Sequence, residues 1–60
     1  MSAPKVVIVD CEKAGLINGP FWVVVVKDGK VIASTSGIQG PTGAAGVARN
    51  YCGAYRAVLA

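Results

Sequence analysis

The sequence contains no histidine, and this absence narrows the chemistry available to it. Without histidine, neither a Ser-His nor a Cys-His nucleophilic pair can form. The two cysteines, Cys11 and Cys52, stand far apart without a Cys-x-x-Cys spacing, and a structural zinc site needs four ligands. We expect each cysteine to be a small apolar side chain, with a Cys11–Cys52 disulfide as the alternative. The sequence therefore predicts no metal and no cofactor.

Acidic residues are scarce and unevenly placed. The chain carries three of them against six Lys and Arg, which gives a net charge of +3, and all three lie in the first half. The charges of the last thirty residues are Arg49 and Arg56 alone, fewer than the clustered basic residues typical of a nucleic-acid-binding stripe. A solvated helix face is the default interpretation of these arginines, and a phosphate contact is the alternative.

Long apolar runs are also missing. No run approaches the roughly 20 residues that a membrane-spanning helix needs, and the first residues lack the pattern of a secretory signal. We therefore expect a cytoplasmic protein with no membrane partner. Apolar residues are nevertheless abundant, at 53% of 60 residues. Because so short a chain buries too little of its surface for this composition, we expect a homo-oligomer or a larger protein or ribonucleoprotein partner.

Three β-branched runs predict strands, over residues 5–10, 21–27 and 30–35. The first run, Lys5-Val-Val-Ile-Val-Asp10, shows no alternation of apolar and polar residues, which is typical of a strand buried on both faces. Asp28-Gly29 separates the second and third runs, and this dipeptide favours a two-residue hairpin turn in which both residues have positive φ. Phe21 and Trp22 begin the second run, and we expect them to pack in the core rather than to stack on bases.

The second half of the sequence predicts a loop followed by a helix. Glycine recurs at every third position within residues 36–46, which favours a flexible loop. The helix is expected over residues 47–60, because four apolar residues follow the i, i+4, i+7, i+8 spacing of one helical face. These residues, which we assign to the core or to a protein interface, are Tyr51, Tyr55, Val58 and Leu59. The predicted fold is a single α+β domain over residues 1–60, in β-β-β-α order, with a three-stranded antiparallel sheet and one C-terminal helix.

Several of these features together suggest a family. Asp10 ends the first strand, an Asn18-Gly19-Pro20 turn precedes the second, and the helix reads Asn50-Tyr-Cys-Gly-Ala-Tyr-Arg. This arrangement resembles the first half of the ribonuclease H-like fold, in which the first strand carries a catalytic Asp and four carboxylates hold two metal ions. Only Asp10 falls on a matching carboxylate position, and Ala54 stands at the position of the helix Glu. The resemblance therefore implies a catalytically incomplete module that is not an enzyme.

The function expected from this resemblance is binding. We expect a non-catalytic ribonuclease H-like module that acts as a small accessory subunit of a nucleic-acid or ribonucleoprotein assembly, with RNA as a candidate ligand. The alternatives are a structural self-assembling subunit of an oligomer or capsid, and a fragment of a ribonuclease H-like enzyme whose missing half supplies the other carboxylates. The nucleic-acid-binding candidates are Arg49, Asn50 and Arg56, of which the first two are expected at the helix start, where backbone amides favour anions. The structural alternative for Asp10 is a strand-ending residue that bonds its own loop.

Overall fold

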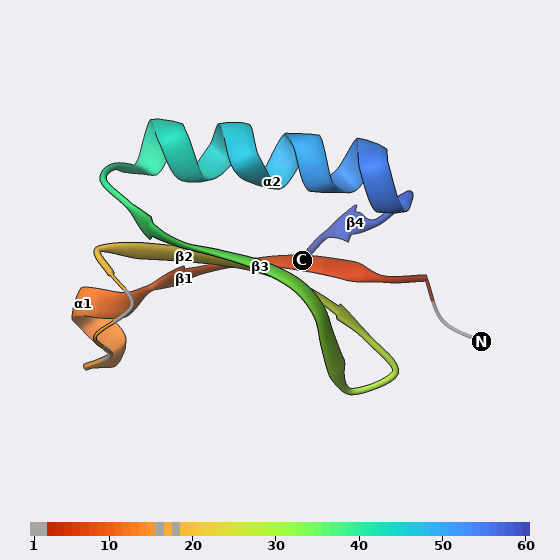
Figure 1. The fold of residues 1–60 in the computed structure, drawn as a ribbon, viewed down its shortest axis with the longest axis horizontal. Helices are drawn as coiled ribbons and strands as arrows, with labels where there is room; N and C mark the ends of the chain where they lie inside the picture. Colours follow the sequence, from red (N-terminus) through yellow and green to blue (C-terminus); the bar gives the residue numbers. More distant parts are fainter. Residues whose placement is uncertain (1–2, 16, 18) are drawn as a thin grey trace.

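The computed structural model describes residues 3–15, 17 and 19–60. Over these residues the chain forms a four-stranded mixed sheet, and a long helix packs against one face of it (Figure 1). The strands lie side by side in the order β3-β2-β1-β4. Along the chain the elements are β1 (Lys5–Asp10), α1 (Cys11–Ala14), β2 (Phe21–Lys27), β3 (Lys30–Ile38), α2 (Pro41–Tyr55) and β4 (Val58–Leu59).

The first two strands and the hairpin confirm the prediction from the sequence. β1 and β2 have the predicted bounds and pair antiparallel. β2 pairs antiparallel with β3 through a turn in which Asp28 and Gly29 have φ values of 53° and 78°, the positive values that this kind of turn requires. β3 runs to Ile38, past the predicted end at residue 35. The predicted Asn18-Gly19-Pro20 turn lies partly outside the described residues, because Asn18 is not among them.

The prediction of a three-stranded antiparallel sheet is wrong, because a parallel fourth strand joins the free edge of β1. In this pairing Val58 of β4 lies beside Lys5. The Val58 backbone N–H donates to the Pro4 carbonyl oxygen at 3.0 Å, and the Ala60 N–H donates to the Val6 carbonyl oxygen at 2.9 Å. The helical spacing of the last apolar residues does not predict this strand. β4 forms only because β1, at the other end of the chain, offers it a free edge.

The helix is displaced from its predicted bounds of 47–60. It begins at Pro41, where proline is favoured because the first helical turn leaves its N–H groups unbonded. Most of the predicted 36–46 loop is therefore strand or helix. The helix ends at Tyr55, because Arg56 adopts a left-handed conformation with φ of 51° and its N–H bonds the Cys52 carbonyl oxygen.

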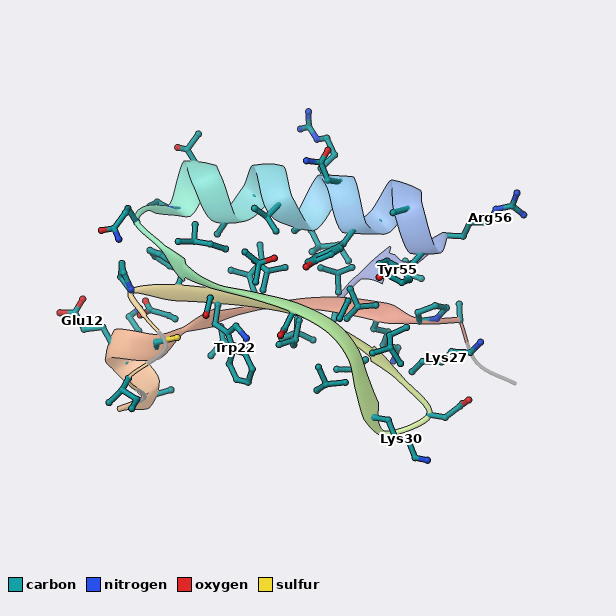
Figure 2. All side chains as sticks on the ribbon, in the orientation of Figure 1. Glu12, Trp22, Lys27, Lys30, Tyr55 and Arg56 are labelled. Carbon is teal, nitrogen blue, oxygen red and sulfur yellow. The ribbon has the colours of Figure 1, made fainter. Side chains whose placement is uncertain are left out.

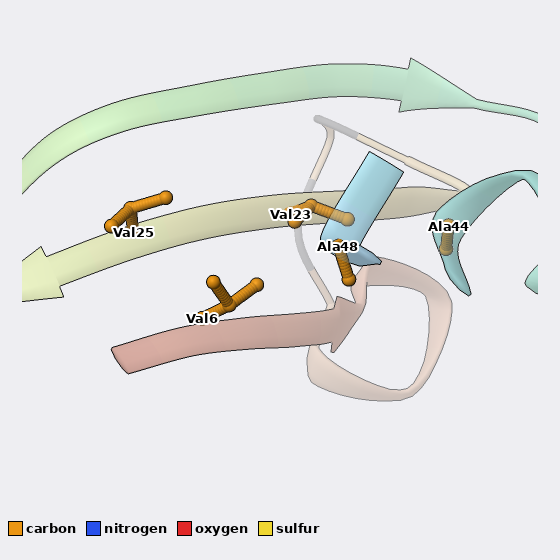
Figure 3. Packing of buried hydrophobic residues seen from close by; sticks show 5 residues of the cluster. All are labelled: Val6, Val23, Val25, Ala44 and Ala48. Carbon is orange, nitrogen blue, oxygen red and sulfur yellow. The ribbon is translucent and has the colours of Figure 1, made fainter. Parts of the chain in front are cut away.

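Two alanines of α2 hold the helix on the sheet. Ala44 and Ala48 are one helical turn apart, and both are buried. They pack against three fully buried valines of β1 and β2, namely Val6, Val23 and Val25 (Figure 3). Glycines within α2 lower its intrinsic helix propensity, and this packing offsets the cost. The prediction of a flexible loop over residues 36–46 is wrong because this packing stabilises a helix from Pro41 onward.

The other face of the sheet carries apolar side chains and is not covered by α2. The register places Val7 opposite Val24 and Val9 opposite Trp22. Because side chains alternate along a strand, these residues lie on the opposite face from Val6, Val23 and Val25. Figure 2 shows Trp22 pointing away from α2. The prediction that Phe21 packs in the core is confirmed, whereas Trp22 belongs to the second face, which we call the open face.

Gly19 lies in close contact with Cys11. A Cβ added to Gly19 would lie 2.8 Å from the Cys11 Cβ, and the Cys11 side chain is fully buried. The Cys11 N–H also donates to the Pro20 carbonyl oxygen at 3.0 Å, which fixes the two segments together. We therefore expect Gly19→Ala to lower the free energy of unfolding by about 1–3 kcal/mol, as overpacking does. Urea unfolding followed by tryptophan fluorescence measures this change.

Gly53→Ala is the matched control. Gly53 lies inside α2, and a Cβ there would meet no atom of the described residues within 4 Å. Alanine is favoured over glycine in a helix interior by about 1 kcal/mol, so this variant is expected to be more stable than the wild type. Equal stability of Gly19→Ala and the wild type would contradict the close contact.

Candidate functional site

Asp10 ends β1 and caps the short helix that follows. Its Oδ1 accepts a hydrogen bond from the Lys13 backbone N–H at 3.2 Å, the geometry of an N-cap residue. The residue keeps an extended conformation, with φ of −82° and ψ of 97°. The interpretation of Asp10 as a strand-ending residue that bonds its own loop is confirmed.

The carboxylates of the described residues do not assemble into a metal site. Among these residues no group of three or more His, Cys, Asp or Glu side chains is arranged so that it could hold a metal ion. Glu12, on α1, is exposed. Cys11 and Cys52 are both free thiols, the first buried and the second half-buried.

Ala54, which the resemblance places at the position of a catalytic Glu, does not lie beside Asp10. The end of α2 leads into β4, which pairs with the start of β1, whereas Asp10 is at the end of β1. The start of α2 lies nearer to Asp10, because β3 ends opposite Phe21, and Phe21 pairs with Asp10. The first turn of α2 carries no acidic residue. Among the described residues, α2 therefore supplies no carboxylate that could join Asp10 in a metal site.

Arg49 and Asn50 lie in the interior of α2, so the prediction that they start the helix is wrong. Both side chains are exposed. The helix start is at Pro41, preceded by Gly40, which makes no side-chain capping bond. The argument that backbone amides support an anion at Arg49 and Asn50 therefore no longer applies.

The four residues predicted as one helical stripe are divided between two elements. Tyr51 is half-buried, and its hydroxyl forms a hydrogen bond of 2.6 Å with Thr35 Oγ1 of β3. Tyr55 ends α2 with its ring 5.8 Å from that of Tyr51. Val58 and Leu59 belong to β4, where both are more than half exposed. A common helical face is thus excluded, and their role in an interface stays a prediction.

Four exposed basic residues lie at one end of the molecule, on both sides of the sheet, and we call this the basic end. They are Lys5, Lys27, Lys30 and Arg56. Lys27 and Lys30 face each other beside the hairpin turn, and Lys5 pairs with Val26 in the adjacent strand. Figure 2 shows Arg56 extending from the same end of the molecule as Lys27 and Lys30.

The basic end is strongly positive for so small a protein. Its four positive charges and the one negative charge of Asp28 leave an excess of three. All four basic side chains are exposed. The sequence alone does not show this group, because Lys5, the Lys27–Lys30 turn and Arg56 are far apart along the chain. The strand register brings Lys5 next to the end of β2, and the end of α2 adds Arg56.

No pocket is found among the described residues, and none of the helices described is long and apolar enough to cross a membrane. No protein-family model, curated protein or solved structure matches this chain. The basic end and the open face are therefore the features from which a function can be argued.

The capping role of Asp10 predicts the behaviour of its variants. Asp10→Ala removes the bond to the Lys13 N–H and is expected to lower the free energy of unfolding by about 0.5–2 kcal/mol. Asp10→Asn keeps a side-chain acceptor and is expected to retain most of the wild-type stability. Thermal unfolding with and without Mg²⁺ measures both effects, and we expect Mg²⁺ to leave the Tm unchanged. A Tm that rises with Mg²⁺ in the wild type alone would contradict the capping interpretation.

The hydrogen bond between Tyr51 and Thr35 predicts a difference between the two tyrosines. Tyr51→Phe removes this bond and leaves Thr35 without that partner, so the free energy of unfolding is expected to fall by about 1 kcal/mol. Tyr55→Phe, one helical turn away, is the matched control and is expected to change it by less than about 0.5 kcal/mol. Chemical denaturation of both variants checks the comparison, and an equal loss would argue against the bond.

Proposed function

We propose that this chain is a non-catalytic nucleic-acid-binding module, a small accessory subunit that contacts phosphates with its basic end. The observation that carries the proposal is the position of Lys5, Lys27, Lys30 and Arg56 at the same end of the molecule. Lysine and arginine side chains bind the phosphate backbone without reading its sequence, and they release counterions as they do so. RNA in a ribonucleoprotein assembly is the ligand we favour.

The absence of catalysis is part of the same proposal. Asp10 is engaged in capping α1, and the first turn of α2 supplies no second carboxylate. A two-metal mechanism needs several carboxylates around the ions. The proposed relationship to ribonucleases H is supported by Asp10 at the end of β1 and by the hairpin that precedes the helix. The cytoplasmic location also belongs to this proposal and rests on the sequence patterning alone.

The basic end replaces part of the site predicted from the sequence. Arg56 remains a candidate phosphate ligand, because it lies at the basic end. Arg49 and Asn50 lie on the exposed side of α2. We expect them to contribute less, since a single arginine in the interior of a helix has neither a helix N-terminus nor other basic residues to reinforce it.

The test is the salt dependence of RNA binding. We expect a fluorescently labelled single-stranded RNA to bind at low salt and to dissociate as the salt concentration rises, as measured by fluorescence anisotropy. In a plot of log K against log salt concentration, the slope is expected to become less negative by about 0.7 for each phosphate-contacting lysine that is replaced. Lys27→Gln and Lys30→Gln should therefore each weaken binding and flatten the slope. The labelled RNA should stay intact in the presence of Mg²⁺.

Arg49→Gln is the matched control for these variants. Arg49 is an exposed arginine in the interior of α2, away from the basic end, and its loss changes the net charge by the same amount. We expect it to weaken binding and flatten the slope less than Lys27→Gln or Lys30→Gln does. Equal losses from Arg49→Gln and Lys30→Gln would show a dependence on net charge alone and contradict a localised site. Cleavage of the RNA that depends on Asp10 would contradict the non-catalytic role.

A further inference from the structure

The sheet has apolar side chains on both faces, and α2 covers one of them. The uncovered face spans three strands, because the register aligns Val7 with Val24, Val9 with Trp22, and Val26 with Val31. Within it Val24 is buried by its neighbours, Trp22 is half-buried, and Val31 is 55% exposed. The apolar residues of this open face on β1, β2 and β3 are Val7, Val9, Trp22, Val24, Val26 and Val31. Ser34 pairs with Val24 on the same face, and Val58 of β4 extends the face beside Lys5. Val31 and Val58 are more than half exposed, and an apolar face left uncovered in this way is a candidate interaction surface.

The two ends of the open face carry charges of opposite sign. At one end lies α1, where Asp10 and Glu12 outweigh Lys13. At the other end lies the turn between β2 and β3, where Lys27 and Lys30 flank Asp28. Figure 1 shows that α1 and this turn both lie on the side of the sheet away from α2. The start of β1 adds Lys5 to the second end, since Lys5 shares the face of Val7.

We propose that a second copy of this chain covers the open face, with the two sheets packed face to face and turned end for end. Such a dimer places the α1 end of each copy over the hairpin end of the other. The contact is isologous, so a two-fold axis repeats each attraction between opposite charges. In the alternative dimer, with the two hairpin ends together, Lys27 and Lys30 of one copy lie near those of the other, and this orientation is disfavoured because like charges repel. Charges at the rim of an interface mainly set its orientation, while the apolar centre supplies the affinity.

The composition of the strands supports this dimer. β1 and β2 lack the alternation of apolar and polar residues seen in sheets with one face in water. Packing two such faces together gives the two-sheet arrangement in which side chains from both inner faces form the core. On β4, Val58 pairs with Lys5 and so extends the open face, whereas Leu59 pairs with Val6 and so lies on the α2 face. The proposal therefore assigns self-association to the open face, with Val58 at its edge, and not to Leu59.

The mass in solution and the environment of Trp22 test the proposal together. We expect sedimentation equilibrium of the nuclease-treated protein to give about twice the chain mass of 6.1 kDa. Trp22 is the sole tryptophan, so its emission reports on the open face directly. The emission should shift to the blue as the protein concentration rises through the dimerisation range. A monomer at all concentrations would overturn the proposal, as would a dimer whose tryptophan emission does not change with association.

Two matched variants separate the open face from the face on which α2 packs. Val31 and Leu59 are apolar residues with nearly equal exposure, 55% and 57%, on β3 and β4. Val31 lies on the open face, whereas Leu59 pairs with Val6 and so lies on the α2 face. Val31→Asp is expected to weaken dimerisation at least about tenfold, because a carboxylate must lose its water in the interface. Leu59→Asp is expected to leave it unchanged. Circular dichroism confirms that each variant is folded. The reverse result, with the dimer lost in Leu59→Asp and kept in Val31→Asp, would overturn the proposal.

A charge-reversal pair tests the end-for-end orientation. Glu12→Lys and Lys30→Glu should each weaken the dimer at low salt, because each places like charges at both contacts. The double variant should regain much of the loss. Two single variants without effect, or a double variant weaker than either, would overturn this orientation. The mass of each variant is measured on nuclease-treated protein, so the outcome is read apart from nucleic-acid binding, although Lys30 belongs to both proposals.

Discussion

The close contact of α2 with the sheet is the constraint on which the rest of this structure depends. Ala44 and Ala48 bring the helix down onto Val6, Val23 and Val25, and these residues form the buried cluster of the molecule. With side chains this small, the core is thin and consists largely of valine and alanine. A thin core stabilises the fold modestly, as expected for a chain of 60 residues. The fixed position of α2 in turn brings β4 to the edge of β1.

The parts of the fold that depend on local sequence could be predicted, and those that depend on contacts between distant segments could not. β1, β2 and the Asp28-Gly29 turn follow from β-branched runs and from a dipeptide that tolerates positive φ. The start of α2 was missed because glycines at every third position disfavour a helix locally. Its packing onto the sheet, which no local pattern reports, offsets that cost. β4 was missed for the same reason, since its partner is the first strand.

The same distinction applies to the candidate sites. Asp10 is predicted correctly as a strand-ending residue that bonds its own loop, because its bond to Lys13 is local, whereas the short helix that it caps is not predicted. Arg49 and Asn50 were assigned to a helix terminus that lies elsewhere, so an error in the helix bounds became an error in the site. The basic end depends on the pairing of Lys27 with Lys30 and on the position of Lys5 in the next strand. Charge counts along the sequence show how many lysines there are, and the sheet register shows which of them are neighbours.

The pairing of β4 with β1 has a consequence for the order of folding. Lys5 and Val58 lie beside each other although almost the whole chain separates them. Closing so large a loop costs more entropy than forming the β2–β3 hairpin, whose strands are joined by two residues. We therefore expect the hairpin to form early and the β4 pairing to be the closing step. Its exposed side chains also make β4 the segment that can detach at the lowest cost, while the valine and alanine core stays intact.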